Sequence, residues 1–390
     1  MKIDSSYIIE KLNNDNKGMT SSVSSEEDYF ELVKNREISE EALIADFKEI
    51  RLRIGEHMKL DNVMFLFGNG ASIYAGSRDT KEFTLQNFSE MEEFCEIKDV
   101  LQNINGLGIE EQLNALITIR AYYEIVKDRR EVAISTLINM IKKDLINSFV
   151  NSIDYRKLIW HEVLLRKLRS FGCLNKTQIY TPNYDLAFEY SLDALGIEYN
   201  DGFSGFVNRL FDPRTLVENN KTSLVKVHGS VNWIYEDGHI KEMQPKFENG
   251  KVVVNDTQPV LIYPTSNKLY QTYSTPYSEL MRHMLNELES GKNTLIVLGY
   301  KYGDDHINEI LYKALKNPNN IFYFFIYGNP ENCEFIHDVS SLADDMPNIN
   351  IISGKILASF DTFVKYLMPA TPEKTDEERA LELLQKVLER

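Results

Sequence analysis

Four short segments of the sequence carry polar residues and glycines of the types found in nucleotide sites, and each follows an apolar run. A Gly-x-Gly-x-Ser turn after a buried strand lets backbone approach a pyrophosphate closely. Amide, carboxylate and imidazole side chains at the other three positions can orient a ribose, favour a developing positive charge and accept a proton. The segments are Gly68-Asn69-Gly70-Ala71-Ser72, Thr181-Pro182-Asn183-Tyr184-Asp185, His228-Gly229-Ser230 and Gly299-Tyr300-Lys301-Tyr302-Gly303-Asp304.

The apolar runs before these segments are expected to be strands of one sheet. Strands that are apolar throughout and alternate with helices indicate a parallel sheet covered on both faces. In such a sheet, ligands bind beyond the carboxyl ends of the strands, where the four segments fall. The predicted fold class is therefore α/β, a Rossmann-like parallel sheet of about six strands. The six predicted strands are 63–67, 177–181, 223–227, 294–298, 321–327 and 349–352.

Three parts of the chain are expected around this sheet. Residues 1–60 form a helical extension, with an amphipathic helix over 39–54 that Gly55 ends. Residues 61–330 form the nucleotide-binding domain. It contains a helical insertion at about 85–172 and a β-hairpin insertion at about 231–263, where Asp237-Gly238 is a typical hairpin turn. Residues 331–390 supply the last strand and C-terminal helices, including a charged helix over 376–390.

Composition narrows the classes of protein that the chain can be. Its 390 residues carry a formal net charge of −16, which argues against a protein that grips nucleic acid through phosphate neutralisation. No eighteen-residue apolar segment or signal peptide is found, so no membrane association and a cytoplasmic location are expected. Three distant cysteines, Cys95, Cys173 and Cys333, cannot form a four-thiolate zinc site, and no metal is expected.

In this order, the four segments resemble motifs of the sirtuin family, and more closely those of its bacterial sirtuin-like branch. The glycine turn is similar to the cofactor loop, TPNYD to the Thr-x-Asn-x-Asp motif, and KVHGS to the catalytic His-Gly. LGYKYGDDHIN is similar to a late nucleotide-binding segment, and Pro264-Thr265 with Lys268 to a feature of the bacterial branch. The resemblance covers about residues 63–326 and implies a sirtuin-like fold that binds NAD⁺.

The resemblance also implies roles for individual residues. Cleavage of the nicotinamide–ribose bond of NAD⁺ needs an anchored diphosphate, an oriented ribose and a base. Gly70 and Ser72, with a helix N-terminus after them, are expected to donate to the diphosphate, and Tyr300 and Asp304 to lie on the adenosine side. The catalytic residues are expected to be Asn183, Asp185 and His228. The cofactor-binding residues are expected to be Gly68, Asn69, Gly70, Ala71, Ser72, Asn183, Asp185, Gly299, Tyr300 and Asp304.

Each role has a structural alternative. Asn183 and Asp185 could cap the helix that follows them, since Asp is a good cap. His228 could be a hydrogen-bonded core histidine, and His283 and His306 are interpreted as structural. Lys301, where the branch often has a small residue, and Arg78, in the loop after the glycine turn, are given no firm role.

Three classes of function follow. The first is an NAD⁺ glycohydrolase that depletes NAD⁺ in anti-phage defence, a homo-oligomer acting with a HerA-type ATPase, as the family resemblance and chain size imply. The second is an NAD⁺-dependent protein deacylase or ADP-ribosyltransferase, which the lack of a four-cysteine module disfavours. The third is a non-catalytic NAD⁺ or ADP-ribose-binding scaffold, which the set Asn183, Asp185 and His228 disfavours.

Overall fold

A computed structural model describes residues 1–4, 6–7, 25–35, 45, 47–59, 62–78, 91–217, 221–253, 259–262, 272–328 and 333–371. Its centre is an eight-stranded sheet in the order β1-β14-β13-β12-β2-β3-β7-β4, in which every neighbouring pair is parallel. The strands are β1 (Lys2–Ile3), β2 (Asn62–Phe67), β3 (Thr177–Thr181), β4 (Tyr199–Asn200), β7 (Thr222–Lys226), β12 (Asn293–Leu298), β13 (Ile321–Ile326) and β14 (Ile349–Ser353).

The α/β fold and all six predicted strands are confirmed, and the sheet is two strands wider than expected. The extra strands β1 and β4 lie at the two edges and have two residues each. Such short runs show no periodicity in the sequence. The six inner strands are found because each is a continuous run of apolar residues between turns.

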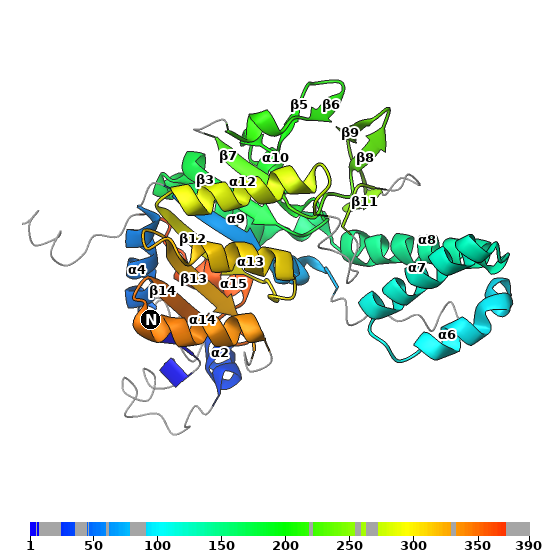
Figure 1. Ribbon diagram of the computed structural model, residues 1–390. Coiled ribbons are helices and arrows are strands. Elements are labelled where there is room, and N and C mark those ends of the chain that lie inside the picture. Colours follow the sequence, from blue (N-terminus) through cyan, green and yellow to red (C-terminus); the bar gives the residue numbers. More distant parts are fainter. Residues whose placement is uncertain are drawn as a thin grey trace, which may run out of the picture.

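Helices cover both faces of the sheet, as Figure 1 shows for α12, α13 and α14 on one side. Side chains of β2 alternate between the two cores: Phe65 packs with α4, α9 and α10, whereas Leu66 packs with α12, α13 and α14. The helices of this body are α2 (Glu26–Lys34), α4 (Lys48–Met58), α9 (Ile159–Phe171), α10 (Ala187–Ala194), α12 (Tyr277–Ser290), α13 (Asp305–Ala314), α14 (Glu334–Asp345) and α15 (Phe360–Thr362), followed by the π-helical turn η10 (Phe363–Leu367).

The helical insertion has a core of its own and projects from the sheet (Figure 1). Its long helices α7 and α8 pack against each other. α9, the last helix of the predicted range, packs instead on the sheet through residues such as Leu164 and Leu168. The insertion contains η4 (Glu92–Ile97), α6 (Lys98–Ile104), α7 (Ile109–Val126), α8 (Arg130–Ile146), η5 (Asn147–Asn151) and η6 (Tyr155–Lys157); η7 (Leu174–Lys176) leads from α9 into β3.

The β insertion is larger than one hairpin. Asp237 and Gly238, both with positive φ, form the predicted turn between β8 and β9. These strands join two from the segment before β7, in the order β5-β6-β9-β8, and a separate pair β10-β11 follows. The strands are β5 (Phe203–Ser204), β6 (Arg209–Phe211), β8 (Trp233–Glu236), β9 (His239–Glu242), β10 (Lys246–Glu248) and β11 (Lys251–Val253), and η8 (Pro213–Val217) lies before β7.

Two predicted terminal features differ from the structure or fall outside it. Gly55 does not end the N-terminal helix: α4 continues to Met58, and the glycine allows close packing, since a Cβ there would lie 3.3 Å from Pro369. The start of the predicted 39–54 helix and the whole 376–390 helix lie outside the described residues.

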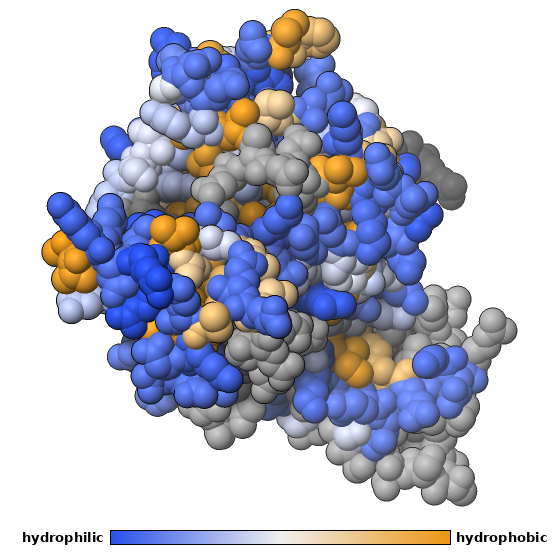
Figure 2. Space-filling view, turned by 90° about the vertical axis from the view of Figure 1, so that its right-hand side faces the viewer, coloured by the Kyte–Doolittle hydropathy of each residue, from blue (hydrophilic) through white to orange (hydrophobic). Residues whose placement is uncertain are grey.

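One face of the molecule is largely polar. The face in Figure 2 is mostly hydrophilic, with hydrophobic residues gathered in separate patches. Within the described ranges, no helix is long and apolar enough to cross a membrane.

Candidate functional site

The glycine turn after β2 packs directly on the turn after β12. Gly68 N–H donates to the Leu298 carbonyl at 3.0 Å, and Gly70 N–H donates to the Gly299 carbonyl at 2.9 Å. A Cβ on Gly68 would lie 2.5 Å from the Gly299 oxygen, and one on Gly70 would lie 2.6 Å from the Gly299 Cα. Gly299 has φ +64 and is equally confined. The three glycines are therefore required for two backbone turns to touch.

The helix expected after this turn is not present. Residues 69–75 form two 3₁₀ turns, η1 (Asn69–Ala71) and η2 (Ile73–Ala75), so no α-helix N-terminus follows Ser72 directly. The expected donors also have partners inside the protein. Gly70 N–H bonds to Gly299, and the Ser72 hydroxyl donates to Asp185 Oδ2 at 3.0 Å. The Asn69 side chain donates to the Arg78 carbonyl and accepts from Ser77. The donation of Gly70 and Ser72 to a diphosphate is not supported by these contacts.

Asn183 lies at the junction of β3 and β2. Its backbone N–H donates to Thr181 Oγ1 at 3.0 Å, and its side-chain Nδ2 donates to the Gly68 carbonyl at 3.2 Å. The Thr181 hydroxyl in turn donates to the Phe67 carbonyl. The side chain is fixed but 9% of the residue stays exposed. Within the described part of the chain, its amide oxygen accepts no hydrogen bond, so it can accept one from a ligand.

Asp185 bonds to the first residue of α10, although Leu186, not Asp185, is the N-cap residue. Its Oδ1 accepts from the Ala187 N–H at 3.0 Å, at the start of α10, and its Oδ2 accepts from Ser72. Burial raises the pKa of this carboxyl above its usual 3.8, while Lys226, the Ala187 N–H and the Ser72 hydroxyl oppose the rise. Both oxygens thus hold protein groups, and Asp185 ties the glycine turn to α10.

A buried lysine holds the loop Asn183–Asp185 through hydrogen bonds to its backbone. Lys226, at the end of β7, donates to the carbonyls of Tyr184 and Asp185 and pairs with Glu189 Oε1 at 2.8 Å. The side chains of Lys226 and Glu189 are only 3% and 13% exposed. Burial raises the pKa of Glu189, and the lysine opposes this rise. The pair fixes the loop against α10.

His228 follows β7 and is held through its backbone. Its carbonyl accepts from the Ile262 N–H at 2.8 Å, and the next residue, Gly229, pairs with Leu261 in a β-bridge. Gly229 has φ +87, and a Cβ there would lie 2.1 Å from the Val260 oxygen. His228 is 3% exposed. The predicted feature at Pro264, Thr265 and Lys268 lies outside the described residues.

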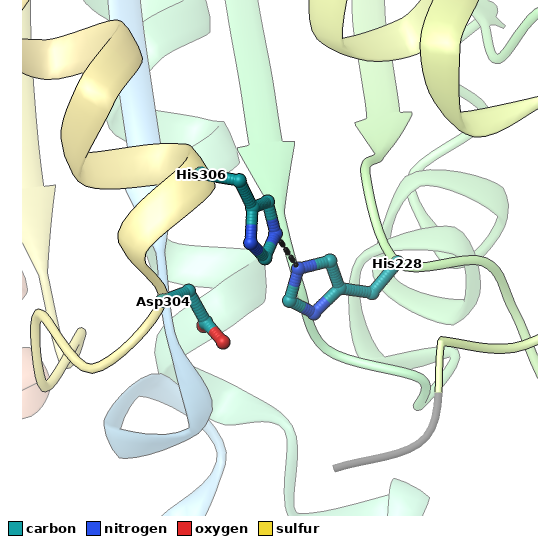
Figure 3. Close-up of side chains that lie close together, drawn as sticks. All are labelled: His228, Asp304 and His306. Atoms are coloured by element: carbon teal, nitrogen blue, oxygen red, sulfur yellow. Dashed lines mark hydrogen bonds between the residues drawn. The ribbon is translucent and has the colours of Figure 1, made fainter. Parts of the chain in front are cut away.

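The structure brings His306 and Asp304 to His228, which the sequence did not reveal. The Nε2 atoms of His228 and His306 are 2.7 Å apart, and one ligand atom from each of the three residues lies within 4.8 Å of the others (Figure 3). His306 is 7% exposed. The sequence indicates a structural role for His306, although this residue lies only two positions after Asp304, a predicted site residue. Asp304 lies at the His228 end of the site. The adenosine-side role of Asp304 stays a prediction.

Tyr300 holds the loop before α13. Its hydroxyl accepts from the Asp304 N–H at 3.2 Å and lies 3.5 Å from Asn308 Oδ1. The Asn308 amide donates to the carbonyl of Tyr302, whose φ is +56. Lys301 and Arg78 are exposed. Tyr300 therefore fixes the conformation of the loop that joins β12 to α13.

His228, Asp304 and His306 are the one group in the described ranges whose side chains could together hold a metal ion. The three cysteines are free, respectively exposed, buried and half-buried, and none belongs to this group. Three cysteines cannot supply the four thiolates of a Cys₄ zinc site.

Comparison with known families identifies part of this architecture. Residues 177–343 match the family model described as a SIR2-like domain. The match includes Asn183, Asp185, His228, Asp304 and His306 but begins after the glycine turn. No curated protein matches the sequence.

The chain also matches solved structures of sirtuins, at low sequence identity and with TM-scores below 0.5. A Sir2 homolog–NAD complex is 11% identical over 81% of this chain and 93% of its own, with a TM-score of 0.41. A structure described as the structural basis for sirtuin substrate affinity is 12% identical over 83% of this chain and 95% of its own, with a TM-score of 0.37. A Sir2 homologue mutant with ADP-ribose is 12% identical over 85% and 98%, also with a TM-score of 0.37.

Proposed function

We propose that this chain is an NAD⁺ glycohydrolase, which converts NAD⁺ and water to ADP-ribose, nicotinamide and a proton. The observation that carries the proposal is the SIR2-like match over the two adjacent strand ends that hold Asn183 and His228. Asn183 presents an amide oxygen that can orient a water or a ribose hydroxyl. The imidazole of His228, in its neutral form, has one unprotonated nitrogen that can accept a proton.

The reaction divides between these two side chains. As the nicotinamide–ribose bond breaks, positive charge develops on the ribose, and nicotinamide leaves as a neutral molecule. Water then adds to the anomeric carbon and loses one proton. In the proposed mechanism Asn183 orients the oxygen nucleophile, and His228 takes the proton, directly or through a ribose hydroxyl. Asp185 acts by positioning, since both of its oxygens hold protein groups.

Asn183→Ala and His228→Ala should each lower NAD⁺ hydrolysis by about 10²–10⁴-fold, the usual contribution of a base or positioning group. Nicotinamide release is measured by chromatography on the full chain, alone and with a HerA-type ATPase. His239→Ala is the matched control, because His239 is exposed on β9. Unchanged turnover in both site variants, with folding verified by circular dichroism, would contradict the assignment.

The same assay separates the alternatives. A protein deacylase or ADP-ribosyltransferase would release nicotinamide only with an acylated peptide or acceptor protein. A scaffold would bind NAD⁺ or ADP-ribose without turnover. The lack of a cysteine zinc module among the free cysteines disfavours the deacylase.

We also propose that the protein is a homo-oligomer that acts with a HerA-type ATPase in anti-phage defence. An unrestrained NAD⁺ hydrolase would harm its host, so the free chain should be restrained until a trigger or partner acts. The support is the motif resemblance. Light scattering of the intact chain, with and without the ATPase, tests this. A monomer that is fully active alone would contradict it.

A further inference from the structure

The cluster of His228, His306 and Asp304 joins two segments that follow strands which are not neighbours in the sheet, β7 and β12. His228 lies two residues after β7. Asp304 is the N-cap of α13, the helix that follows β12, and His306 is the second residue of that helix. The strands β2 and β3 lie between β12 and β7. The chain after β12 therefore has to cross the carboxyl ends of two strands to place His306 against His228 (Figure 3).

Both sides of the cluster are fixed by backbone contacts. The Tyr300 hydroxyl and the Asn308 amide hold the crossing loop, and the Ile262 N–H holds the carbonyl of His228. His228 and His306 are nearly buried, at 3% and 7% exposure. Two imidazoles and a carboxylate are thus held together on a rigid frame, which is the requirement for a preorganised ligand set.

The donor types select a class of ion. Two imidazole nitrogens with one carboxylate oxygen suit zinc and neighbouring transition metals, whereas Ca²⁺ and Mg²⁺ prefer oxygen ligands throughout. Ligand bonds of about 2.0–2.1 Å in a tetrahedral site place two nitrogens about 3.3 Å apart. The observed Nε2 separation is 2.7 Å, a hydrogen-bond distance. Separation of the rings by about 0.6 Å would therefore convert the hydrogen-bonded pair into a ligand pair.

We propose that His228, His306 and Asp304 bind one divalent ion of the zinc class, and that the bound ion restrains the enzyme. An imidazole nitrogen bound to the ion is not available to a proton, so His228 loses its role as base. The ion leaves the fold intact, because the cluster lies beyond the strands and outside both sheet cores. The restraint rests on the proposed function, whereas the metal site does not.

The metal site is tested by calorimetric titration of zinc sulfate into the full chain after removal of bound metals with a chelator. One ion per chain is expected. Asp304→Asn and His306→Ala should each weaken binding by at least about 100-fold, since even partners that only support a ligand are worth 10–100-fold. Asp305→Asn and His337→Ala are matched controls, because both residues are exposed and outside the cluster. No stoichiometric binding, or equal binding by Asp304→Asn and Asp305→Asn, would overturn the site.

Restraint is tested with the unmodified chain and Asp305→Asn. Zinc at saturating concentration should stop nicotinamide release, and excess EDTA should restore it. Saturation by calorimetry without loss of turnover would overturn the restraint. A metal-free chain without NAD⁺ hydrolysis, alone or with its ATPase, would contradict the proposed function instead, and calorimetry would still decide the metal site.

Discussion

Replacement of Lys226 by Met should destabilise the protein strongly, because it removes one partner of a buried ion pair. Met keeps the length of the apolar stem but donates nothing to Glu189 or to the carbonyls of Tyr184 and Asp185. Glu189 then stays as a carboxylate that is 13% exposed and has lost its cation. Loss of one partner of a buried pair costs about 3–5 kcal/mol.

The expected shift is large enough to measure by urea unfolding. At a slope of about 3 kcal/mol per molar urea, the loss lowers the midpoint by about 1–1.7 M. Fluorescence of Trp160 and Trp233 and far-ultraviolet circular dichroism report the transition. Lys241→Met is the matched control: Lys241 pairs with Glu236, whose side chain is 54% exposed. Its loss should cost less than about 1 kcal/mol.

The loss of unfolding free energy caused by Lys226→Met should increase as pH rises. Burial raises the pKa of Glu189 above its usual 4.5, and Lys226 opposes this rise, so its removal raises the pKa further. A carboxyl with a raised folded pKa costs no stability below its unfolded pKa, and the cost grows as pH rises from 4.5 towards the folded pKa. The stability difference from the unmodified chain should therefore be smallest near pH 4.5 and larger at pH 7.

Two results would refute this reasoning. One is a loss of unfolding free energy in Lys226→Met that is no larger than the loss in Lys241→Met. The other is a double variant, Lys226→Met with Glu189→Gln, that remains as unstable as the single one. Neutral side chains at both positions should recover most of the loss, because no uncompensated charge then stays buried.

The remaining predictions concern a backbone contact and a buried histidine. Gly70→Ala should lower the free energy of unfolding in urea by about 1–3 kcal/mol, because its Cβ would lie 2.6 Å from the Gly299 Cα. Gly303→Ala is the control and should cause no such loss, because no atom lies within 4 Å of a Cβ there. Equal effects would contradict the close approach. Burial lowers the pKa of His161 to about 3, so stability should fall as pH drops from 6.5 towards 3. Between pH 7 and pH 5, the free energy of unfolding of His161→Gln should fall by about 2 kcal/mol less than that of the unmodified chain. An equal fall in the two proteins would show that His161 is not buried in its neutral form.

The sequence predicted the inner sheet because its signal is local. Each of the six strands is an apolar run that one window of residues can reveal, and the Asp237-Gly238 hairpin has a two-residue signature. The edge strands β1 and β4 have no such signal, since two residues form a strand only when a neighbour pairs with them. β6 precedes β7 yet pairs with β9, which follows β7. That pairing joins segments on opposite sides of a sheet strand and is not visible in sequence order.

The candidate site was predictable to the same extent. Asn183 and His228 lie where the strand-end rule places them, on neighbouring strands. His306 was missed because that rule considers each strand alone, whereas His306 reaches His228 by crossing two strand ends. Its position two residues after Asp304 was the available signal. The helix expected directly after Ser72 was wrong, because a glycine turn after a strand is compatible with 3₁₀ turns as well as with an α-helix.

The glycine turn and the strand-end polar residues differ in what they say about function. Gly68, Gly70 and Gly299 are required by contact between two backbone turns, whatever the site does. An inactive scaffold with this sheet would need the same three glycines. The free amide oxygen of Asn183 satisfies no fold requirement of this kind, since its Nδ2 alone makes the bond to Gly68. Asn183 variants therefore separate an enzyme from a scaffold more sharply than glycine variants, which would damage both.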